Sequence, residues 1–389
     1  MTACVIEPTA GDAEGATGAG CVITADGGYG ARLARDGDAW FPERWSLGGP
    51  EAYVVPLPGA QPEEAGTEVQ PLADGRVLIH RRIEGRHLFS LLYPTGPGTG
   101  EVQLGAVECT ELSLLPPSPC GKRVFALAVG EASTVVWQVA GGASGPERLA
   151  EVPGRCGGGV WLDPDGRMLA VDRELGGRTK AVVVDLGRDG AVSPLLQITE
   201  ESDDRLLLAD PDSGLLLIRS DAPGEPRLGW GVLGSTLPVR FPESLRLPGC
   251  SVTPFAVQPG QVLLPESCAV ALRVDGAFGC WVGTWRAADR RVRQVGAPEG
   301  WLAGSGWWSA EGVLGLPYST GDEPCGVARV RVWEGVEVRR EGVWGEREGV
   351  GGEREGVGVG REGVGVGREA AVPRPVPLQQ APLDKLVTK

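Results

Sequence analysis

The stretch Val160-Trp161-Leu162-Asp163-Pro164-Asp165-Gly166-Arg167-Met168-Leu169-Ala170-Val171 consists of two short apolar runs separated by a turn sequence. Short apolar runs between turn residues are typical of buried strands. Asp165-Gly166 suits a tight turn because glycine adopts positive φ without steric cost and aspartate tolerates the left-handed region. Two further apolar runs follow at residues 180–186 and 194–198. The segment therefore predicts four strands in one structural unit.

This unit recurs along the chain with a nearly constant period. Equivalent turns occur at Asp26-Gly27, Asp74-Gly75, Cys120-Gly121, Asp165-Gly166, Asp212-Ser213-Gly214, Pro259-Gly260 and Glu311-Gly312, at intervals of 48, 46, 45, 47, 47 and 52 residues. A four-stranded unit has two apolar faces that it can bury only against neighbouring units, and a closed ring of units leaves no exposed sheet edge. The period therefore predicts an all-β fold, a seven-bladed β-propeller.

Two of the turns also resemble a known repeat. Ser118-Pro119-Cys120-Gly121-Lys122 and Asp163-Pro164-Asp165-Gly166-Arg167 are similar to the S-P-D-G turn of the TolB-like and WD40-like propeller family, and the resemblance spans residues 18–338. It departs from the pattern where other residues replace the turn aspartate, at Cys120, Pro259 and Glu311. The resemblance implies a fold and no particular activity. The seven blades also look like the propeller of prolyl-oligopeptidase-type proteins, here without the hydrolase domain.

The composition divides the chain into three parts. Residues 1–338 form the propeller, and either residues 2–7 or residues 336–339 supply the strand that closes the ring, the N-terminal segment being favoured. Residues 339–369 contain a seven-residue Arg-Glu-Gly-Val repeat, whose glycines each cost about 1 kcal/mol in a helix and so argue against a coiled coil. We expect this low-complexity tail to be disordered. Residues 370–389 form a proline-rich segment that serves as an extended linker or docks on an aromatic groove.

Charge and cysteine content limit the partners and the compartment. The formal net charge of −14 and the lack of a long basic stripe argue against nucleic-acid binding. No signal peptide or membrane-spanning stretch is evident, so we expect a cytoplasmic monomer with no membrane association. The nine cysteines form no CxxC pair and are interpreted as buried small hydrophobic residues, with a Cys268–Cys280 disulfide as the alternative. Many arginines beside few lysines suggest a GC-rich bacterial genome.

The sequence offers little catalytic chemistry. His80 and His87 are the only histidines and cannot form a multi-histidine metal site. No G-x-S-x-G motif is present, and the aspartate-rich turns at residues 163–166 and 210–214 do not continue into a calcium loop. Gly157-Gly158-Gly159 precedes a strand and predicts close packing near the propeller axis. We therefore assign no catalytic, cofactor-binding or metal-binding residue and expect no cofactor.

Two groups of residues are candidates for a binding surface. Loops between the second and third strands of all blades lie on one face, so we expect a charged rim around one mouth of the channel, made of Arg82, Glu84, Arg86, Arg173, Glu174 and Arg178. A tryptophan cluster forms either core between the sixth and seventh blades or an aromatic surface, and core is favoured; its members are Trp281, Trp285, Trp301, Trp307 and Trp308.

Three functions are consistent with these observations. A non-catalytic scaffold or binding module with an unknown protein or peptide partner accounts best for a propeller repeat without a catalytic constellation. The alternative is the gating propeller of a prolyl-oligopeptidase-like serine hydrolase. A metal-dependent propeller enzyme is the least favoured function, because histidines are few and no acidic cluster can be placed on the axis. The balance favours a protein that is not an enzyme.

Overall fold

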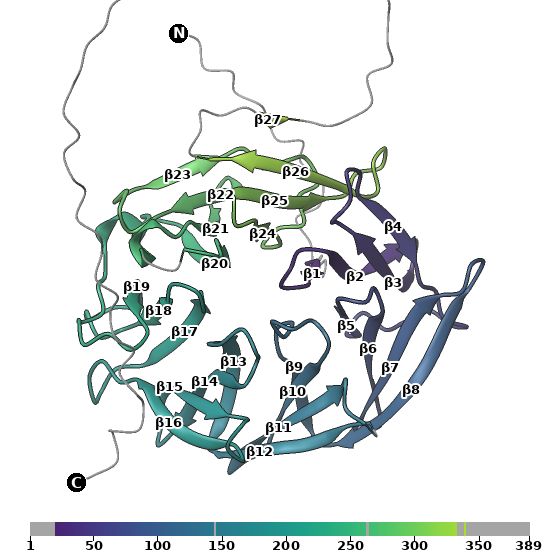
Figure 1. The fold of residues 1–389 in the computed structure, drawn as a ribbon, viewed down its shortest axis with the longest axis horizontal. Helices are drawn as coiled ribbons and strands as arrows, with labels where there is room; N and C mark the ends of the chain where they lie inside the picture. Colours follow the sequence, from purple (N-terminus) through teal and green to yellow (C-terminus); the bar gives the residue numbers. More distant parts are fainter. Residues whose placement is uncertain (1–19, 144, 262–263, 333–337, 340–389) are drawn as a thin grey trace, which may run out of the picture. The chain divides into compact units, whose positions relative to one another are not determined.

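The structure of the chain is a computed structural model that describes residues 20–143, 145–261, 264–332 and 338–339. Within these residues, seven β-sheets are arranged in a ring with the first strand of each sheet innermost (Figure 1). The sequence prediction of an all-β, seven-bladed propeller is therefore confirmed. The predictions for the tail, residues 340–389, lie outside the described residues.

The blades are numbered one to seven in chain order, and in each blade the strands run antiparallel from the centre outward. Blade one contains β1 (Val22–Ile23), β2 (Tyr29–Asp36), β3 (Ala39–Ser46) and β4 (Tyr53–Pro56); blade two contains β5 (Glu68–Pro71), β6 (Val77–Ile83), β7 (Arg86–Pro94) and β8 (Thr99–Glu108). Blade three contains β9 (Glu111–Leu114), β10 (Val124–Val129), β11 (Ser133–Ala140) and β12 (Glu147–Pro153); blade four contains β13 (Arg155–Trp161), β14 (Met168–Leu175), β15 (Arg178–Asp185) and β16 (Ala191–Leu196).

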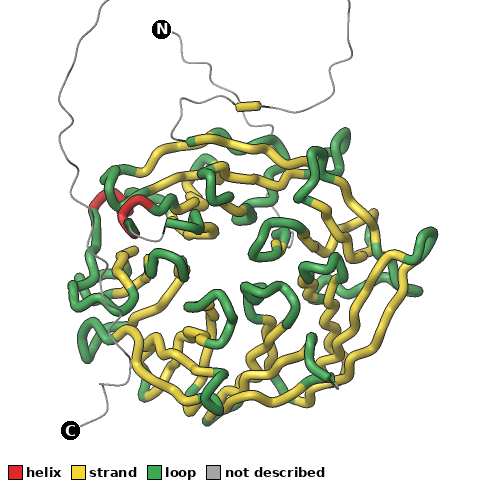
Figure 2. Tube along the Cα trace, viewed as in Figure 1, coloured by secondary structure: helices red, strands yellow, loops and turns green. Residues whose placement is uncertain are grey.

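Blade five departs from the four-stranded pattern. It has three strands, β17 (Asp204–Ala209), β18 (Leu215–Ser220) and β19 (Arg227–Val232), and an isolated antiparallel bridge from Trp230 to Arg240 stands where a fourth strand would begin. Blade six contains β20 (Ser251–Val257), β21 (Val270–Gly276), β22 (Gly279–Trp285) and β23 (Val292–Val295); blade seven contains β24 (Trp307–Trp308), β25 (Val313–Tyr318), β26 (Gly326–Arg331) and β27 (Val338–Arg339). Two short 3-10 helices, η1 (Glu243–Leu245) and η2 (Pro265–Ser267), are the helical segments in Figure 2.

The turn glycines behave as the sequence predicts. Each joins the first strand of a blade to the second, and each has positive φ: Gly27, Gly75, Gly121, Gly166, Gly214, Gly260 and Gly312, with φ between 63° and 81°. The replacement of aspartate at Cys120, Pro259 and Glu311 leaves this conformation intact, because the glycine alone must adopt positive φ.

The outer strand of the seventh blade comes from the C-terminal candidate. β27 pairs antiparallel with β26 through Val330↔Val338 and Arg329↔Arg339. The sequence analysis favoured residues 2–7 for this position, and that segment lies outside the described residues. Because β27 pairs within its own blade, contacts other than this strand join the first and last blades. One of them is the hydrogen bond that Arg32 of β2 donates to Ser319 Oγ of blade seven at 3.2 Å.

The hydrophobic core lies between the blades. The described residues form seven apolar clusters, one between each pair of neighbouring blades. The tryptophans are distributed among these clusters. They pack in the core as predicted, but at three blade interfaces instead of the single interface between blades six and seven that the sequence predicts. Trp301 and Trp308 pack between blades six and seven, Trp281 and Trp285 between blades five and six, and Trp307 between blades seven and one. Each bulky ring fills the wedge between two diverging sheets.

One face of the ring carries all the loops between second and third strands. Because strands alternate in direction, these hairpins lie at the same end of the blades as the connections that lead into each first strand. We call this end the hairpin face. Its inner edge is marked by an ion pair of 2.8 Å between Arg155 and Glu111, the first residues of β13 and β9. In the part of the chain that the structure describes, no helix has the length and apolar character needed to cross a bilayer.

Candidate functional site at the seam between blades four and five

The rim residues predicted from the sequence lie on the hairpin face in two separate groups. Arg82, Glu84 and Arg86 belong to the β6–β7 hairpin of blade two, and Arg173, Glu174 and Arg178 to the β14–β15 hairpin of blade four. Blade three stands between them. Arg86 pairs with Glu108 at 3.3 Å, and Arg178 pairs with Glu201 at 2.9 Å. Among the described residues, no hydrogen bond or ion pair joins the two groups.

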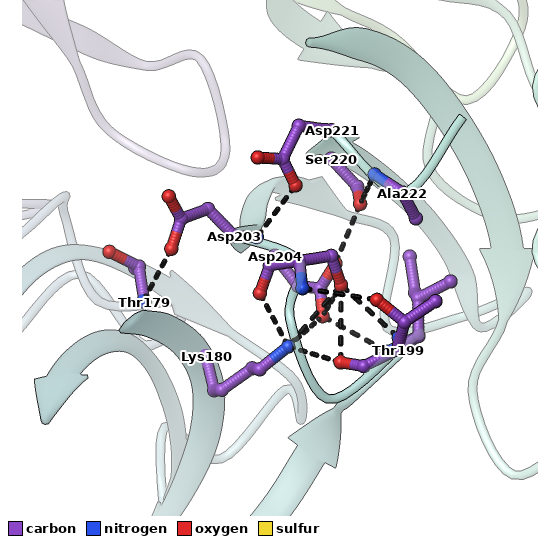
Figure 3. Close-up of polar contacts among 10 residues, drawn as sticks. Thr179, Lys180, Thr199, Asp203, Asp204, Ser220, Asp221 and Ala222 are labelled. Atoms are coloured by element: carbon purple, nitrogen blue, oxygen red, sulfur yellow. Dashed lines mark hydrogen bonds and ion pairs between the residues drawn. The ribbon is translucent and has the colours of Figure 1, made fainter. Parts of the chain in front are cut away.

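Blade four forms the more elaborate polar site, because Lys180 of β15 reaches across to blade five. Its Nζ donates to Asp204 Oδ2 at 2.9 Å, to Thr199 O at 2.6 Å and to Ser202 O at 2.5 Å (Figure 3). An ammonium group has three donors, and all three are occupied here. The Lys180 side chain is therefore fully engaged in contacts that join blade four to the start of blade five.

The partner carboxylate is fully enclosed. The Asp204 side chain has no exposed surface, and it also accepts hydrogen bonds from Ser220 Oγ at 2.6 Å and Ser202 Oγ at 2.9 Å. Burial raises the pKa of this carboxyl, but the hydrogen bonds from Ser220, Lys180 and the backbone outweigh burial and hold the pKa below its usual value. A buried ion pair with every hydrogen bond satisfied fixes the two blades in one register.

The residues on either side of Asp204 continue the attachment to blade four. Asp203 Oδ1 accepts a hydrogen bond from Thr179 N at 2.7 Å, and Arg205 Nη2 donates to Thr179 Oγ1 at 3.3 Å. Leu206 N donates to Asp172 Oδ1 at 2.9 Å. Four consecutive residues of blade five therefore bond to β14 and β15, so the start of β17 is rigidly placed.

Asp172 is the chemically distinct residue of this seam. Its side chain is only 6% exposed, and its second oxygen, Oδ2, lies 3.9 Å from Arg205 Nη1. Burial raises the pKa of the Asp172 carboxyl to about 6, since the Leu206 N–H and the distant Arg205 charge compensate only in part. The group therefore changes charge close to neutral pH, which an exposed aspartate does not do.

The glycine stretch of β13 lies directly against Asp172. Gly157 pairs with Asp172, and a β-bulge then places Gly158 and Gly159 before the next pair. A Cβ on Gly158 would lie 3.1 Å from Asp172 Oδ2, and one on Gly159 would lie 2.4 Å from Leu115 Cδ2. Gly159 thus confirms the predicted close packing, whereas a Cβ on Gly157 would meet no atom within 4 Å. The unexpected role of the stretch is to leave Asp172 Oδ2 uncovered.

A second polar cluster occupies blade two. His80 Nδ1 lies 2.7 Å from Glu68 Oε2, His80 Nε2 lies 2.8 Å from His87 Nδ1, and His87 Nε2 lies 3.2 Å from Cys109 O. Both imidazoles are buried, and His80 stacks on Phe89. The two histidines therefore contact each other and a carboxylate.

Neither cluster assembles a set of metal ligands. No group of three histidine, cysteine or acidic side chains suited to a metal ion occurs in the ranges that the structure describes. The aspartate-rich turns act as turns: Asp163 Oδ1 accepts hydrogen bonds from the backbone of Arg167 and Met168. Cys268 is buried, Cys280 is exposed and both are free thiols. The described cysteines are buried at four positions only, Cys21, Cys156, Cys268 and Cys325.

Sequence reasoning missed the residues that make up the seam. The available signal was a charged residue inside an apolar strand, as in Ala170-Val171-Asp172 and in Lys180 before Ala181-Val182-Val183. A charge at such a position is buried only if a partner compensates it. The partner, Asp204, lies in another blade, so the sequence alone could not identify it.

Comparisons with known proteins address the fold. No family model matches the chain, and no curated protein matches it. Solved structures that are similar include TolB from Acinetobacter baumannii, with 11% identity over 78% of this chain and 77% of that chain and a TM-score of 0.42. A putative TolB from Agrobacterium tumefaciens has 16% identity over 80% of this chain and 90% of that one, with a TM-score of 0.39.

Prolyl oligopeptidase B from Galerina marginata, bound to a 35mer hydrolysis and macrocyclization substrate, has 11% identity over 82% of this chain and a TM-score of 0.50. The present chain covers 49% of that enzyme. At such low identity the similarity concerns the fold alone. The chain is a seven-bladed β-propeller, structurally similar to the propellers of TolB and prolyl oligopeptidase.

Proposed function

We propose that this propeller is a non-catalytic binding module whose hairpin face receives a protein or peptide partner. The observation that carries the proposal is Phe278, at the tip of the β21–β22 hairpin, whose side chain is 105% exposed relative to the reference state. Leu175 and Ile83 occupy the corresponding tips of blades four and two and are 56% and 53% exposed. Large apolar side chains on loop tips gain stability only when a partner covers them.

The charged residues beside these exposed apolar side chains also support a binding surface on the hairpin face. Leu175 is flanked by Glu174 and Arg178, and Ile83 by Arg82 and Glu84. Apolar anchors surrounded by charged residues resemble the core and rim of a protein interface, in which the rim charges orient the partner. The occupied donors of Lys180 favour a structural role for this residue over a catalytic one.

The experiment is site-specific photocrosslinking in the source cells, with a benzoyl-phenylalanine at position 278. The matched control carries the same residue at Leu237, which is 63% exposed outside the hairpin face. We expect a crosslinked partner from position 278 and none from position 237. The purified partner should then bind Phe278→Ser and Leu175→Ser about tenfold more weakly than wild type, as expected for interface anchors. Equal crosslinking at both positions, or unchanged affinity of both variants, would rule the proposal out.

The identity of the crosslinked protein also tests the alternative role. A partner that is a separate serine hydrolase would favour a gating propeller, and its activity on long and short peptides should then depend on the presence of this chain. A partner without hydrolase activity supports the binding module.

A further inference from the structure

Asp172 Oδ2 and Arg205 Nη1 form an acceptor and a donor that lie side by side at the seam. They are 3.9 Å apart, which is too long for a hydrogen bond. The other atoms of the two groups are occupied, since Asp172 Oδ1 accepts from Leu206 N and Arg205 Nη2 donates to Thr179 Oγ1. Among the described residues, Asp172 Oδ2 accepts no hydrogen bond and Arg205 Nη1 donates none, so the only interaction of these two atoms is their long ion pair. Oδ2 belongs to a side chain that is only 6% exposed, so a ligand that donates a hydrogen bond to it gains more here than at a fully exposed carboxylate.

The backbone of β13 leaves this pair accessible. Gly158 is exposed, and a side chain there would stand 3.1 Å from Asp172 Oδ2. Gly157, next to it, has open space on its side-chain side. Arg205 is 49% exposed, so its guanidinium can adjust to a ligand. The four attachments from residues 203–206 to blade four hold the remaining parts of the site in place.

We propose that this pair binds an amide group, whose N–H donates to Asp172 Oδ2 and whose C=O accepts from Arg205 Nη1. A primary amide presents one N–H and its C=O side by side on the same edge, which matches an acceptor and a donor that no other hydrogen bond occupies. An ammonium ion would face the charge of Arg205, and a carboxylate would face that of Asp172. The inference deepens the proposed function and rests on it only in that an asparagine or glutamine side chain of a protein or peptide partner is the natural source of a primary amide.

Three small probes of equal size test the chemistry: propionamide, propionate and propylammonium. Each is titrated at neutral pH into the 15N-labelled protein, and the backbone amide signals of Leu206 and Gly158 are followed. We expect saturable shifts with propionamide in the millimolar range, and at least about tenfold weaker binding of the two charged probes, the factor for losing one charge-assisted hydrogen bond.

The variant Asp172→Asn makes the test more specific because it replaces the hydrogen-bond acceptor at Oδ2 with a donor. Its Oδ1 still accepts from Leu206 N, while an NH₂ group replaces Oδ2 and presents a second donor beside Arg205. Propionamide should bind about tenfold more weakly to this variant, and propionate should bind more tightly than it does to wild type. A structural role of Asp172 alone would not produce such an exchange of preference.

A steric pair of variants provides the control. Gly158→Ala places a Cβ against Oδ2, whereas Gly177→Ala adds one at a hairpin position where no atom lies within 4 Å. Their φ values of +69° and +76° make the backbone strain of the two variants comparable. We expect Gly158→Ala to lose propionamide binding and Gly177→Ala to retain it.

Two results would overturn the inference. Absence of saturable shifts with propionamide means that only water bridges the pair, and tighter binding of propylammonium means a site for cations. Phe278→Ser separates this inference from the proposed function. That variant should bind propionamide like wild type even when partner binding is lost, whereas failed propionamide binding with intact partner binding refutes the amide site alone.

Discussion

His80 Nε2 lies 2.8 Å from His87 Nδ1, and this contact is the middle one of three in a row. Glu68 faces the outer nitrogen of His80 at 2.7 Å, and Cys109 O faces the outer nitrogen of His87 at 3.2 Å. Three hydrogen bonds need three protons, but two neutral imidazoles supply only two, and neither an ionised carboxylate nor a carbonyl supplies any. The contact between Glu68 and His80 Nδ1 therefore requires a third proton, which these two groups share.

This proton can be detected directly because the protein has only two histidines. We predict that long-range 1H–15N spectra show one proton on His80 Nε2 and one on His87 Nε2, with the third proton between Glu68 Oε2 and His80 Nδ1. Burial and the neighbouring His80 hold the pKa of His87 below its usual value, so His87 should stay neutral as pH falls through about 6.5, where a free histidine gains its charge. Two neutral imidazoles beside an ionised Glu68, or a proton on His87 Nδ1, would contradict the proton count.

Glu68→Gln is the matched control for that prediction. The glutamine amide can donate to His80 Nδ1, so all three hydrogen bonds form with two neutral imidazoles. The expected spectrum shows both histidines neutral and the positions of the His87 signals little changed. A doubly protonated His80 in this variant would mean that another group holds the proton.

Asp172 is predicted to weaken the fold at neutral pH. Its folded pKa of about 6 lies above the usual aspartate value of 3.8, so between these two pH values the folded state holds a proton that the unfolded state has already released. The penalty is absent below about pH 4, grows between pH 4 and 6 and is complete above pH 6. Asp172→Asn should therefore increase the free energy of unfolding at pH 7 by about 1–3 kcal/mol. Urea unfolding at several pH values checks this, and a gain that persists below pH 4 contradicts the assigned cause.

Asp204, unlike Asp172, is predicted to stabilise the folded protein at neutral pH. Its pKa is lowered in the folded state, so its contribution to stability is present above the unfolded pKa of about 3.9 and is lost as pH falls through the folded pKa. Asp204→Asn leaves Lys180, only 14% exposed, without its counter-charge and should cost about 3–5 kcal/mol. The measurement is urea unfolding of Asp204→Asn, Lys180→Met and the double variant. The double variant should be more stable than Asp204→Asn, and a simple sum of the two losses would show that the pair is not coupled.

The sequence predicts the local part of this fold well. The turn glycines determine seven hairpins because glycine adopts positive φ without steric cost, so the turn at Gly166 and its six equivalents appear where the pattern places them. The sequence left two candidates for the closing strand, since either chain end could supply a short extended segment; the second candidate pairs with β26, and the favoured residues 2–7 lie outside the described residues. The tryptophans were placed in the core, but which blades they join depends on how each sheet turns relative to its neighbour.

The candidate site depends on contacts that no local pattern records. Lys180 and Asp204 are 24 residues apart in different blades, and Asp172 meets Leu206 N across 34 residues. The rim prediction included the neighbouring hairpin, Arg173 to Arg178, because topology places it on the same face, and its role in binding stays a prediction. It did not identify Asp172, because a single aspartate in a strand gives no indication of whether a donor reaches both of its oxygens.

Cys120 is predicted to be the most reactive cysteine near neutral pH. Burial raises the pKa of its thiol, but the backbone N–H of Lys122 and the Ser118 hydroxyl favour the thiolate more strongly, and the pKa falls to about 7. The thiol occupies the aspartate position of the turn, where the equivalent Asp74 accepts a hydrogen bond from the backbone N–H two residues further on, that of Arg76. By contrast, burial raises the pKa of Cys268 to about 11.

Iodoacetamide labelling followed by peptide mass spectrometry, repeated from about pH 6 to pH 9, tests this difference. The Cys120 rate should reach half its maximum near pH 7, while Cys280, more exposed but with a raised pKa, should label more slowly at that pH because less of it is thiolate. Cys120→Asp restores the carboxylate of the turn and should preserve stability. Faster labelling of Cys280 than of Cys120 at pH 7 would show that exposure, rather than the donors of the turn, controls thiol reactivity in this protein.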